Sequence, residues 1–212
     1  MKRVLVIGAH GKTGHHIINK LQNNSMIPVA GVRTNTQVDE FKKDGIEARL
    51  VDVRQTVDEI YGQLTDIDAI IFSAGGGMMI DLDGKVKAAQ AAKKANIKRF
   101  VLVSAGGIQH FHDSDRLEWM NEYEEYSAAM YYGDMFVLNS DLDYTIIRPE
   151  HLTDDAGTGK INLGSYLPHN DISREDVAEV VVASLQNDKT IKKAFDIENG
   201  TTLISDAINS LK

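Results

Sequence analysis

The stretch VIGAHGKTGHH, residues 6–16, carries glycines at positions 8, 11 and 14 between a short apolar run and a segment with helical apolar spacing. In a strand-to-helix connection such glycines allow a tight turn, a close approach of backbone N–H groups to a pyrophosphate, and close packing of the helix on the strand. The helix N-terminus adds a favourable dipole for an anion. The stretch predicts a nucleotide-binding loop; the alternative is a purely structural turn.

Short apolar runs rich in Val, Ile and Leu alternate with longer amphipathic segments along the chain. Helical spacing occupies the intervals between the runs, for example in REDVAEVVVASL, residues 174–185. This alternation predicts an α/β fold, a Rossmann-like doubly wound parallel sheet. The predicted strands are residues 4–7, 28–32, 47–51, 69–73, 99–104, 144–148 and 194–197.

The length of 212 residues fits one domain, predicted to span residues 1–212, and the sequence contains no internal repeat or Pro-rich linker. One stretch interrupts the alternation. Residues 151–170, HLTDDAGTGKINLGSYLPHN, are rich in Gly, Asp and Thr and are expected to be loop with a short excursion from the main sheet. We expect residues 151–172 and the C-terminal segment to form a small lobe on the substrate side.

Composition excludes several classes of function. The net charge is −8 and the basic residues are scattered, which argues against a nucleic-acid ligand. The absence of cysteine removes disulfides, thiolate nucleophiles and Cys-ligated zinc, and is compatible with a cytoplasmic protein. No apolar run approaches a membrane span or a signal sequence, so no membrane contact is expected. His110, His112 and Asp113 could chelate a metal, but no third cluster supports them, and no metal is expected.

The end of the second predicted strand indicates which dinucleotide the loop takes. An acid about twenty residues beyond the glycines would bind the ribose hydroxyls of NAD, whereas an arginine suits the 2′-phosphate of NADP. The stretch AGVRTNTQ offers Arg33 and no acid. Lys12 and Thr13 add donors within the loop. The sequence therefore predicts NADP(H), with NAD(H) as the alternative and a capping or ion-pairing role as the other interpretation of Arg33.

Further motifs make the chain resemble a known family. They are GAHGKTG, the pair Asp52-Val53, FSAGG, KRFVLVS, LDYTIIRP, LTDDAGTGKINLG, ISREDVAEV and FDIENG, in this order over nearly the whole chain. Together they resemble the atypical short-chain dehydrogenase/reductases of the NAD(P)H-binding, NmrA-like kind. The resemblance implies that 52–53 meet the adenine, that 73–75 lie beside the ribose and pyrophosphate, and that 149–152 border the nicotinamide.

Loop, arginine and resemblance together define the predicted cofactor-binding residues. These are Gly8, His10, Gly11, Lys12, Thr13, Gly14, Arg33, Asp52, Val53, Ser73, Ala74, Gly75, Ser104, Pro149, His151 and Leu152.

Catalytic members of the wider superfamily use a Tyr, a Lys four residues later, and a Ser after the fifth strand. In them the lysine lowers the pKa of the tyrosine that passes a proton to a carbonyl oxygen. Aligning YEEYSAAMYYGD on that helix places Tyr126 at the tyrosine and Met130 at the lysine position, and methionine supplies no charge. Where many relatives have Ser-Ser, this chain has Ser104-Ala105. The predicted catalytic residues are Tyr126, Ser104 and His110.

Two functions remain open at this level. The first is an NADP(H)-dependent reductase of a small conjugated acceptor such as a quinone or flavin, which can be protonated by water. An aromatic segment from Trp119 to Phe136 could wall a flat pocket for it. The second is a non-catalytic dinucleotide sensor that acts through a protein partner, which Met130 and Ala105 favour. An epimerase is a third, weaker alternative. Either protein would be a monomer or a homodimer.

Overall fold

The computed structural model describes residues 2–212. Its principal elements are β1 (Arg3–Ile7), α1 (Lys12–Asn23), β2 (Ile27–Val32), α2 (Asn35–Lys43), β3 (Glu47–Leu50), α3 (Val57–Tyr61), β4 (Ala69–Phe72), α4 (Met78–Asp81), α5 (Asp83–Lys94), β5 (Arg99–Val103), α6 (Glu118–Glu122), α7 (Glu124–Leu138), β6 (Asp143–Pro149), β7 (Leu152–Thr153), β8 (Lys160–Gly164), β9 (Ile172–Ser173), α8 (Arg174–Gln186), β10 (Lys193–Asn199), β11 (Thr202–Leu203) and α9 (Ile204–Asn209). Single 3₁₀ turns, η1 (Ile108–His110) and η2 (Asp188–Thr190), follow β5 and α8.

The main sheet has the strand order β11-β8-β10-β6-β5-β4-β1-β2-β3. All pairings from β3 through β10 are parallel. The strand order reverses at β1, which lies between β2 and β4, and ligands of doubly wound sheets bind at the carboxyl ends of the strands at such a reversal. The predicted Rossmann-like α/β fold is confirmed, and the predicted strand ends agree with the observed ends to within two residues.

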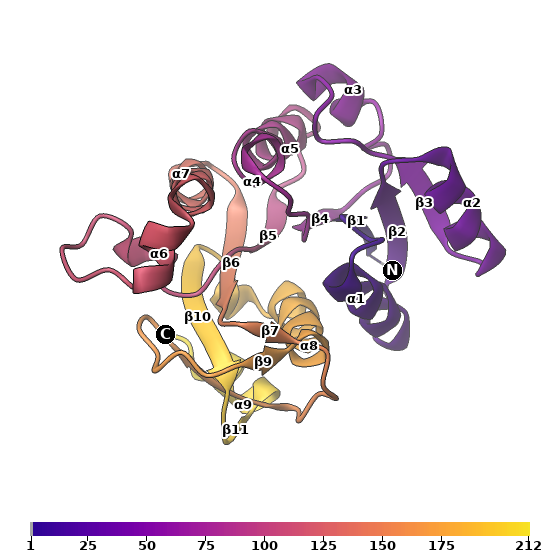
Figure 1. The fold of residues 1–212 in the computed structure, drawn as a ribbon. Coiled ribbons are helices and arrows are strands. Elements are labelled where there is room, and N and C mark those ends of the chain that lie inside the picture. The colour runs from indigo at the N-terminus through magenta and orange to yellow at the C-terminus, as the bar shows by residue number, and fades with distance from the viewer. Residues whose placement is uncertain (1) are drawn as a thin grey trace.

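Helices cover both faces of the sheet (Figure 1). Side chains alternate along a strand, so Val4 and Val6 of β1 pack with α1, α2 and α8, whereas Leu5 and Ile7 pack with α3 and α5. The strands read as continuous apolar runs because both faces are buried. The alternating α and β segments of the sequence thus generate a three-layer molecule.

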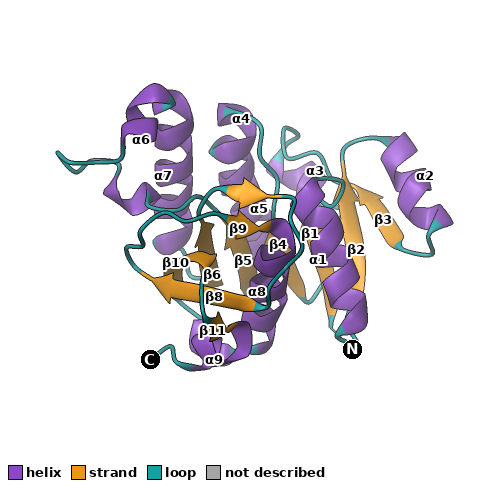
Figure 2. Cartoon of the chain, turned by 60° about the horizontal axis from the view of Figure 1, so that its bottom comes forward, coloured by secondary structure: helices purple, strands orange, loops and turns teal. Residues whose placement is uncertain are grey.

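The predicted loop at 151–170 is wrong in part. Residues 160–164 form β8, which belongs to the main sheet and runs antiparallel to β10, with Ile161 opposite Asn199 (Figure 2). β11 extends this antiparallel edge. Ile161 of the short KINLG stretch is fully buried and fixes this strand in the sheet. The surrounding Gly, Asp and Thr residues are typical of loops, so the composition of the segment did not indicate a strand. The expected excursion is the separate two-stranded sheet of β7 and β9.

Within residues 2–212, no helix is both long enough and apolar enough to cross a membrane.

Candidate active site

The glycine loop joins β1 to α1, and its geometry explains two of its three glycines, Gly8 and Gly14. Gly8 has a φ of +88°, and a Cβ there would lie 2.7 Å from the backbone of Ser73 and Ala74 after β4. A Cβ on Gly14 would overlap the carbonyl oxygen of Gly8. The turn and the helix-on-strand contact therefore both require glycine, as the sequence predicts for a phosphate-binding loop.

The N-terminus of α1 is open to an anion. Gly11 is the N-cap residue, no side chain caps the helix, and its first turn carries no acid. The first backbone N–H groups of a helix have no partner within the helix, so they are free to bind a phosphate. This donor set fits the pyrophosphate of a dinucleotide.

A groove runs along the loop over the carboxyl ends of β1, β2 and β4. It is lined by Ile7, Gly8, His10, Gly11, Gly31, Val32, Arg33, Gln37, Val51, Val53, Ser73, Ala74, Gly75 and Ile80. Eight of the residues predicted to bind the cofactor are among them, and they come from the loop, the end of β2, the end of β3 and the end of β4. We call this hollow the dinucleotide groove.

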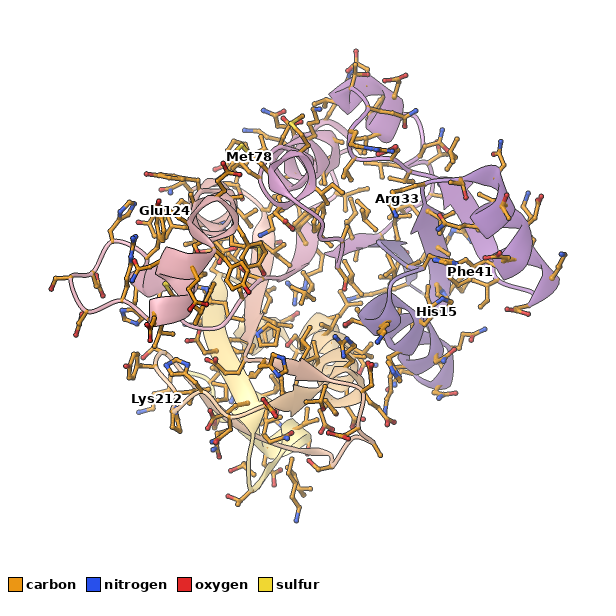
Figure 3. All side chains as sticks on the ribbon, viewed as in Figure 1. His15, Arg33, Phe41, Met78, Glu124 and Lys212 are labelled. Atoms are coloured by element: carbon orange, nitrogen blue, oxygen red, sulfur yellow. The ribbon has the colours of Figure 1, made fainter. Side chains whose placement is uncertain are left out.

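Arg33 lies directly after β2 (Figure 3) and is one of the residues that line the groove. Its guanidinium makes no hydrogen bond or ion pair with any side chain among residues 2–212, since only its backbone N–H is engaged, by Gln37 at 3.0 Å. Asp52 is paired instead with Arg54 at 2.6 Å, and this contact lowers the pKa of the aspartate. The ion-pairing interpretation of Arg33 finds no partner in the structure.

His10, which also lines the groove, contacts Glu40 of α2 at 3.1 Å. Its ring also meets that of His15, which stacks on Phe41 of α2 with centroids 5.2 Å apart (Figure 3). Burial and the neighbouring histidines lower the pKa of His15. These contacts hold α2 against α1 beside Arg33.

A second cavity of about 670 Å³, a size usual for small-molecule sites, lies at the carboxyl ends of β5 and β6. Its lining residues are Ser104, Ala105, Gly106, Leu117, Glu118, Trp119, Tyr123, Tyr126, Pro149, Glu150, His151, Leu152, His169 and Arg174. We call it the acceptor pocket. Because β4 and β5 pair directly, the ends of the two strands place the acceptor pocket next to the dinucleotide groove.

The structure brings Ser104, Tyr126, Pro149, His151 and Leu152 together in the acceptor pocket, as their predicted roles require. Four other predicted cofactor residues line neither hollow: Lys12, Thr13, Gly14 and Asp52.

Lys12 pairs with Asp154, which also binds Arg174 at 2.6 Å. This exposed ionic contact ties the glycine loop to the segment after β7. Lys12 is therefore engaged by a carboxylate rather than facing the groove.

Tyr126 lies on α7 with 39% of its surface exposed, and its ring centroid is 6.3 Å from that of Trp119. Burial, reinforced by the carboxylates of Asp81 and Asp134, raises the pKa of Tyr126 to about 12. The tyrosine therefore keeps its proton at neutral pH. It can donate that proton but is poorly suited to accept one from an alcohol.

His110 lies outside the acceptor pocket. It contacts Asp113 at 2.7 Å and the ring of Tyr166 edge-on at 5.3 Å. The structure therefore does not bring His110 together with Tyr126 and Ser104, and its catalytic role stays a prediction without a contact to the cavity.

The comparisons with known proteins agree with this geometry. A family model described as NAD(P)H-binding matches residues 8–188. The chain belongs to this NAD(P)H-binding family. The resemblance seen in the sequence motifs is thereby confirmed.

Relatives of this NAD(P)H-binding protein carry different descriptions. The Bacillus subtilis protein YhfK, described as an uncharacterized sugar epimerase, is 37% identical and covers 99% of this chain and 100% of its own. A solved structure of a putative NAD-dependent epimerase/dehydratase from Bacillus halodurans is 32% identical, with a TM-score of 0.89 over 100% of both chains. The Lactococcus lactis oxidoreductase ylbE is 31% identical, with a TM-score of 0.90, covering 99% of this chain and 96% of its own.

A buried polar network lies behind the acceptor pocket of this NAD(P)H-binding protein. The Ser104 hydroxyl donates to Asp134 Oδ1 at 2.7 Å, and Arg148 Nε donates to Asp134 Oδ2 at 3.0 Å. The fully buried Lys85 of α5 places its Nζ 3.8 Å from Asp134 and 3.0 Å from Met130 Sδ. Gly133 leaves room for this lysine, because a Cβ there would lie 2.8 Å from Lys85 Cδ.

The sequence predicts no role for His169, and it covers Glu150 only as a member of the 149–152 segment that the resemblance places beside the nicotinamide. It leaves open whether Lys85 reaches the site in place of the missing lysine. Glu150 follows Pro149 in the predicted nicotinamide segment, so its position was marked, but its burial depends on contacts that only the fold creates. Among residues 2–212, no group of three or more His, Cys, Asp or Glu side chains is arranged to hold a metal ion.

Proposed function

We propose that this protein is an NADP(H)-dependent reductase of a small, flat, conjugated acceptor of the quinone or flavin type. The observation that carries the proposal is the acceptor pocket, which sits beside the dinucleotide groove and presents Trp119, Tyr123 and Tyr126. Aromatic rings bind planar conjugated molecules through offset or edge-to-face contacts. The bound dinucleotide supplies the hydride, and the chain supplies the groove, the aromatic wall and a proton.

Arg33 favours NADP(H) over NAD(H). Its guanidinium is free of side-chain partners and lies at the groove end where the adenosine ribose would sit, and no acid follows β2 to bind ribose hydroxyls. A guanidinium binds phosphate oxygens with strong, charge-assisted hydrogen bonds.

The protonated state of Tyr126 favours reduction over epimerisation, although the descriptions of two relatives mention epimerases. An epimerase that oxidises a sugar hydroxyl needs a base to remove its proton. Tyr126, with a pKa of about 12 and Met130 in place of a lysine, holds its proton too firmly for that task. A reduced quinone or flavin needs no strong acid or base from the protein, because the added charge is delocalised over the acceptor.

The second candidate is a dinucleotide sensor that works through a protein partner. Met130 and the engagement of the Ser104 hydroxyl by Asp134 favour it, because both depart from the catalytic arrangement of the superfamily. A sensor must bind the oxidised and reduced cofactors with different affinities, since a ligand shifts a conformational equilibrium only through differential binding.

The test is to follow nicotinamide absorbance of NADPH with purified protein while quinones, flavins, aldehydes and nucleotide sugars are added in turn. We expect quinones or flavins to oxidise NADPH faster than in the protein-free control. Trp119→Ala should reduce that rate while leaving NADPH affinity unchanged, and Tyr132→Ala, on the α7 surface outside the pocket, serves as the matched control. NADPH binding without oxidation by any acceptor would favour the sensor, and sugar interconversion without net oxidation would favour the epimerase.

A further inference from the structure

Glu150 is a buried carboxyl group in the wall of the acceptor pocket. It follows the last residue of β6 and is 8% exposed. Its Oε1 is buried and has no hydrogen-bond partner. The carboxyl group lies against Gly106, where a Cβ would overlap it. If Glu150 were ionised, this oxygen would carry negative charge in a water-poor environment without a donor, so burial favours the neutral carboxyl.

His169 is the one basic side chain in direct contact with Glu150 among the described residues. Its Nδ1 lies 2.9 Å from Glu150 Oε2, and its side chain is 26% exposed and also lines the pocket. The histidine has a φ of +67°, a left-handed conformation that is uncommon for a residue with a side chain. The Tyr166 ring packs edge-on against the imidazole at 5.6 Å. Both ring nitrogens of His169 are buried and have no hydrogen-bond partner among the described residues, so the imidazole lies in contact with the carboxyl inside the pocket wall.

Two further carboxylates of β10 are near Glu150. Asp196 and Glu198 are fully buried; Asp196 accepts from Gln109 at 2.8 Å, and Glu198 accepts from the backbone of Asn170 at 2.9 Å.

Burial raises the pKa of Glu150, the charges of these two carboxylates raise it further, and His169 opposes them. Burial raises the pKa of Asp196 as well, and Gln109, Arg148 and His110 oppose that effect. The surroundings of Glu150 therefore favour its protonated form.

We propose that Glu150 is the proton donor to the acceptor and that His169, in contact with it at 2.9 Å, positions its carboxyl group. The inference rests on the proposed reductase function. Transfer of a hydride to a quinone or flavin leaves the acceptor one proton short. The O–H bond of Glu150 breaks and the proton moves to the anionic oxygen or nitrogen of the acceptor. After the product leaves, water entering the pocket returns a proton to the carboxylate and is left as hydroxide, which the bulk solvent neutralises.

With Glu150 as the proton donor, Tyr126 is no longer needed as the acid. A carboxylic acid gives up its proton far more readily than a tyrosine whose pKa is about 12. Tyr126 then serves mainly as part of the aromatic wall. The two residues can be separated by experiment, because Glu150→Gln keeps the shape of the side chain against Gly106 and Tyr126→Phe keeps the ring.

The experiment is the pH dependence of kcat/KM for acceptor reduction in the wild type and in both variants. We expect the wild-type value to fall as pH rises and Glu150 ionises, and Glu150→Gln to lower it about 10²–10⁴-fold with a flat profile, as for a lost proton donor. His169→Gln should move the fall to higher pH, because His169 lowers the pKa of Glu150.

Glu122→Gln is the matched control, because it makes the same substitution at an exposed position of α6 that does not line the pocket. This variant should behave as wild type. NADPH affinity, measured by fluorescence, should be unchanged in Glu150→Gln. Wild-type activity in Glu150→Gln, or a large loss in Tyr126→Phe alone, would overturn the proposal.

An infrared pH titration separates this inference from the reductase proposal. Wild-type protein should show the C=O stretch of a protonated carboxyl well above the usual glutamic acid pKa of about 4.3, and Glu150→Gln should lack it. If no acceptor is reduced, the reductase function fails, and the proton-donor role fails with it, whatever the infrared result. If acceptors are reduced but the carboxyl band is absent, only the assignment of Glu150 is overturned.

Discussion

The ammonium nitrogen of Lys85 lies 3.0 Å from the sulfur of Met130. Met130 occupies the position, four residues after Tyr126, where catalytic members of the superfamily carry a lysine. The side-chain amine that this helix lacks is therefore present in the same region, supplied by α5 rather than α7. Burial lowers the pKa of Lys85, and Asp134 opposes that effect.

Met130→Lys should destabilise the protein strongly, because a second ammonium group would be buried beside Lys85. We expect a loss of about 3–5 kcal/mol in the free energy of unfolding, the usual cost of an uncompensated buried charge. The exchange variant Lys85→Met/Met130→Lys should recover most of this loss, and Met130→Leu should cost less than about 1.5 kcal/mol. Urea unfolding of the wild type, these three variants and Lys85→Met measures the effect. A loss in the exchange variant equal to the sum of its two single-variant losses would contradict the prediction.

Asp134→Asn should be more damaging than Lys85→Met. The aspartate is shared by Lys85, Arg148 and Ser104, so its replacement leaves two buried cations without their common counter-ion. Removing Lys85 leaves Asp134 still paired with Arg148. We expect a loss of about 3–5 kcal/mol for Asp134→Asn and a clearly smaller loss for Lys85→Met, measured by denaturant unfolding. Equal losses of stability in the two variants would show that Asp134 is not the shared counter-ion of Lys85 and Arg148.

Gly14→Ala should reduce both stability and cofactor affinity. The new methyl group would overlap the Gly8 carbonyl, and neither backbone can move without displacing the loop. We expect a loss of about 1–3 kcal/mol in the free energy of unfolding, with NADPH binding weakened at least about tenfold. Gly62→Ala is the control, since its Cβ would make only an ordinary contact at 3.4 Å. Comparable damage in both variants would mean that the helix-on-strand contact is not the cause.

Arg33→Ala should weaken NADPH binding without changing NADH affinity. A charge-assisted hydrogen bond contributes about 1.5–3 kcal/mol, so a roughly 10- to 150-fold loss in NADPH affinity is expected. Lys42→Ala, at an exposed position of α2, removes a positive charge outside the groove and controls for long-range electrostatic effects. Fluorescence titration measures the affinity for both cofactors. Equal losses of NADH and NADPH affinity would refute the role of Arg33 at the 2′-phosphate.

Glu150 should make the stability of the wild type fall with rising pH. Its pKa is raised in the folded protein, so between the unfolded and folded pKa values the folded state binds more protons than the unfolded chain. Stability then decreases as pH increases through that window. The free energy of unfolding of Glu150→Gln minus that of the wild type should therefore grow from about pH 4 upward. A difference independent of pH would show that the carboxyl group titrates normally.

The sequence predicted the parallel sheet well because both faces of its strands are buried, which leaves continuous apolar runs such as VLVI and FVLV. The antiparallel strand β8 escaped prediction for the opposite reason. It is a short edge strand with one fully buried residue, Ile161, and it lies within a Gly-rich segment. Its place in the sheet depends on pairing with β10, far along the chain.

The site was predictable where a local backbone conformation demands a residue type. Gly8 and Gly14 belong to that class, and their close contacts match the roles that their spacing suggested. The position of Lys85 and the Glu150–His169 contact could not be predicted in this way, because each depends on a neighbour that only folding brings near. Burial and pairing, which give these side chains their properties, leave no signature in the spacing of the residues.

The two hollows divide cleanly along the chain. All residues that line the dinucleotide groove lie between Ile7 and Ile80, and all that line the acceptor pocket lie between Ser104 and Arg174. Substitutions that alter the choice of acceptor therefore accumulate in a contiguous stretch that contributes nothing to the groove. Directed evolution for new acceptors can randomise the later stretch alone, and homologous chains can be recombined between the two stretches to exchange acceptor preference while dinucleotide preference is inherited intact.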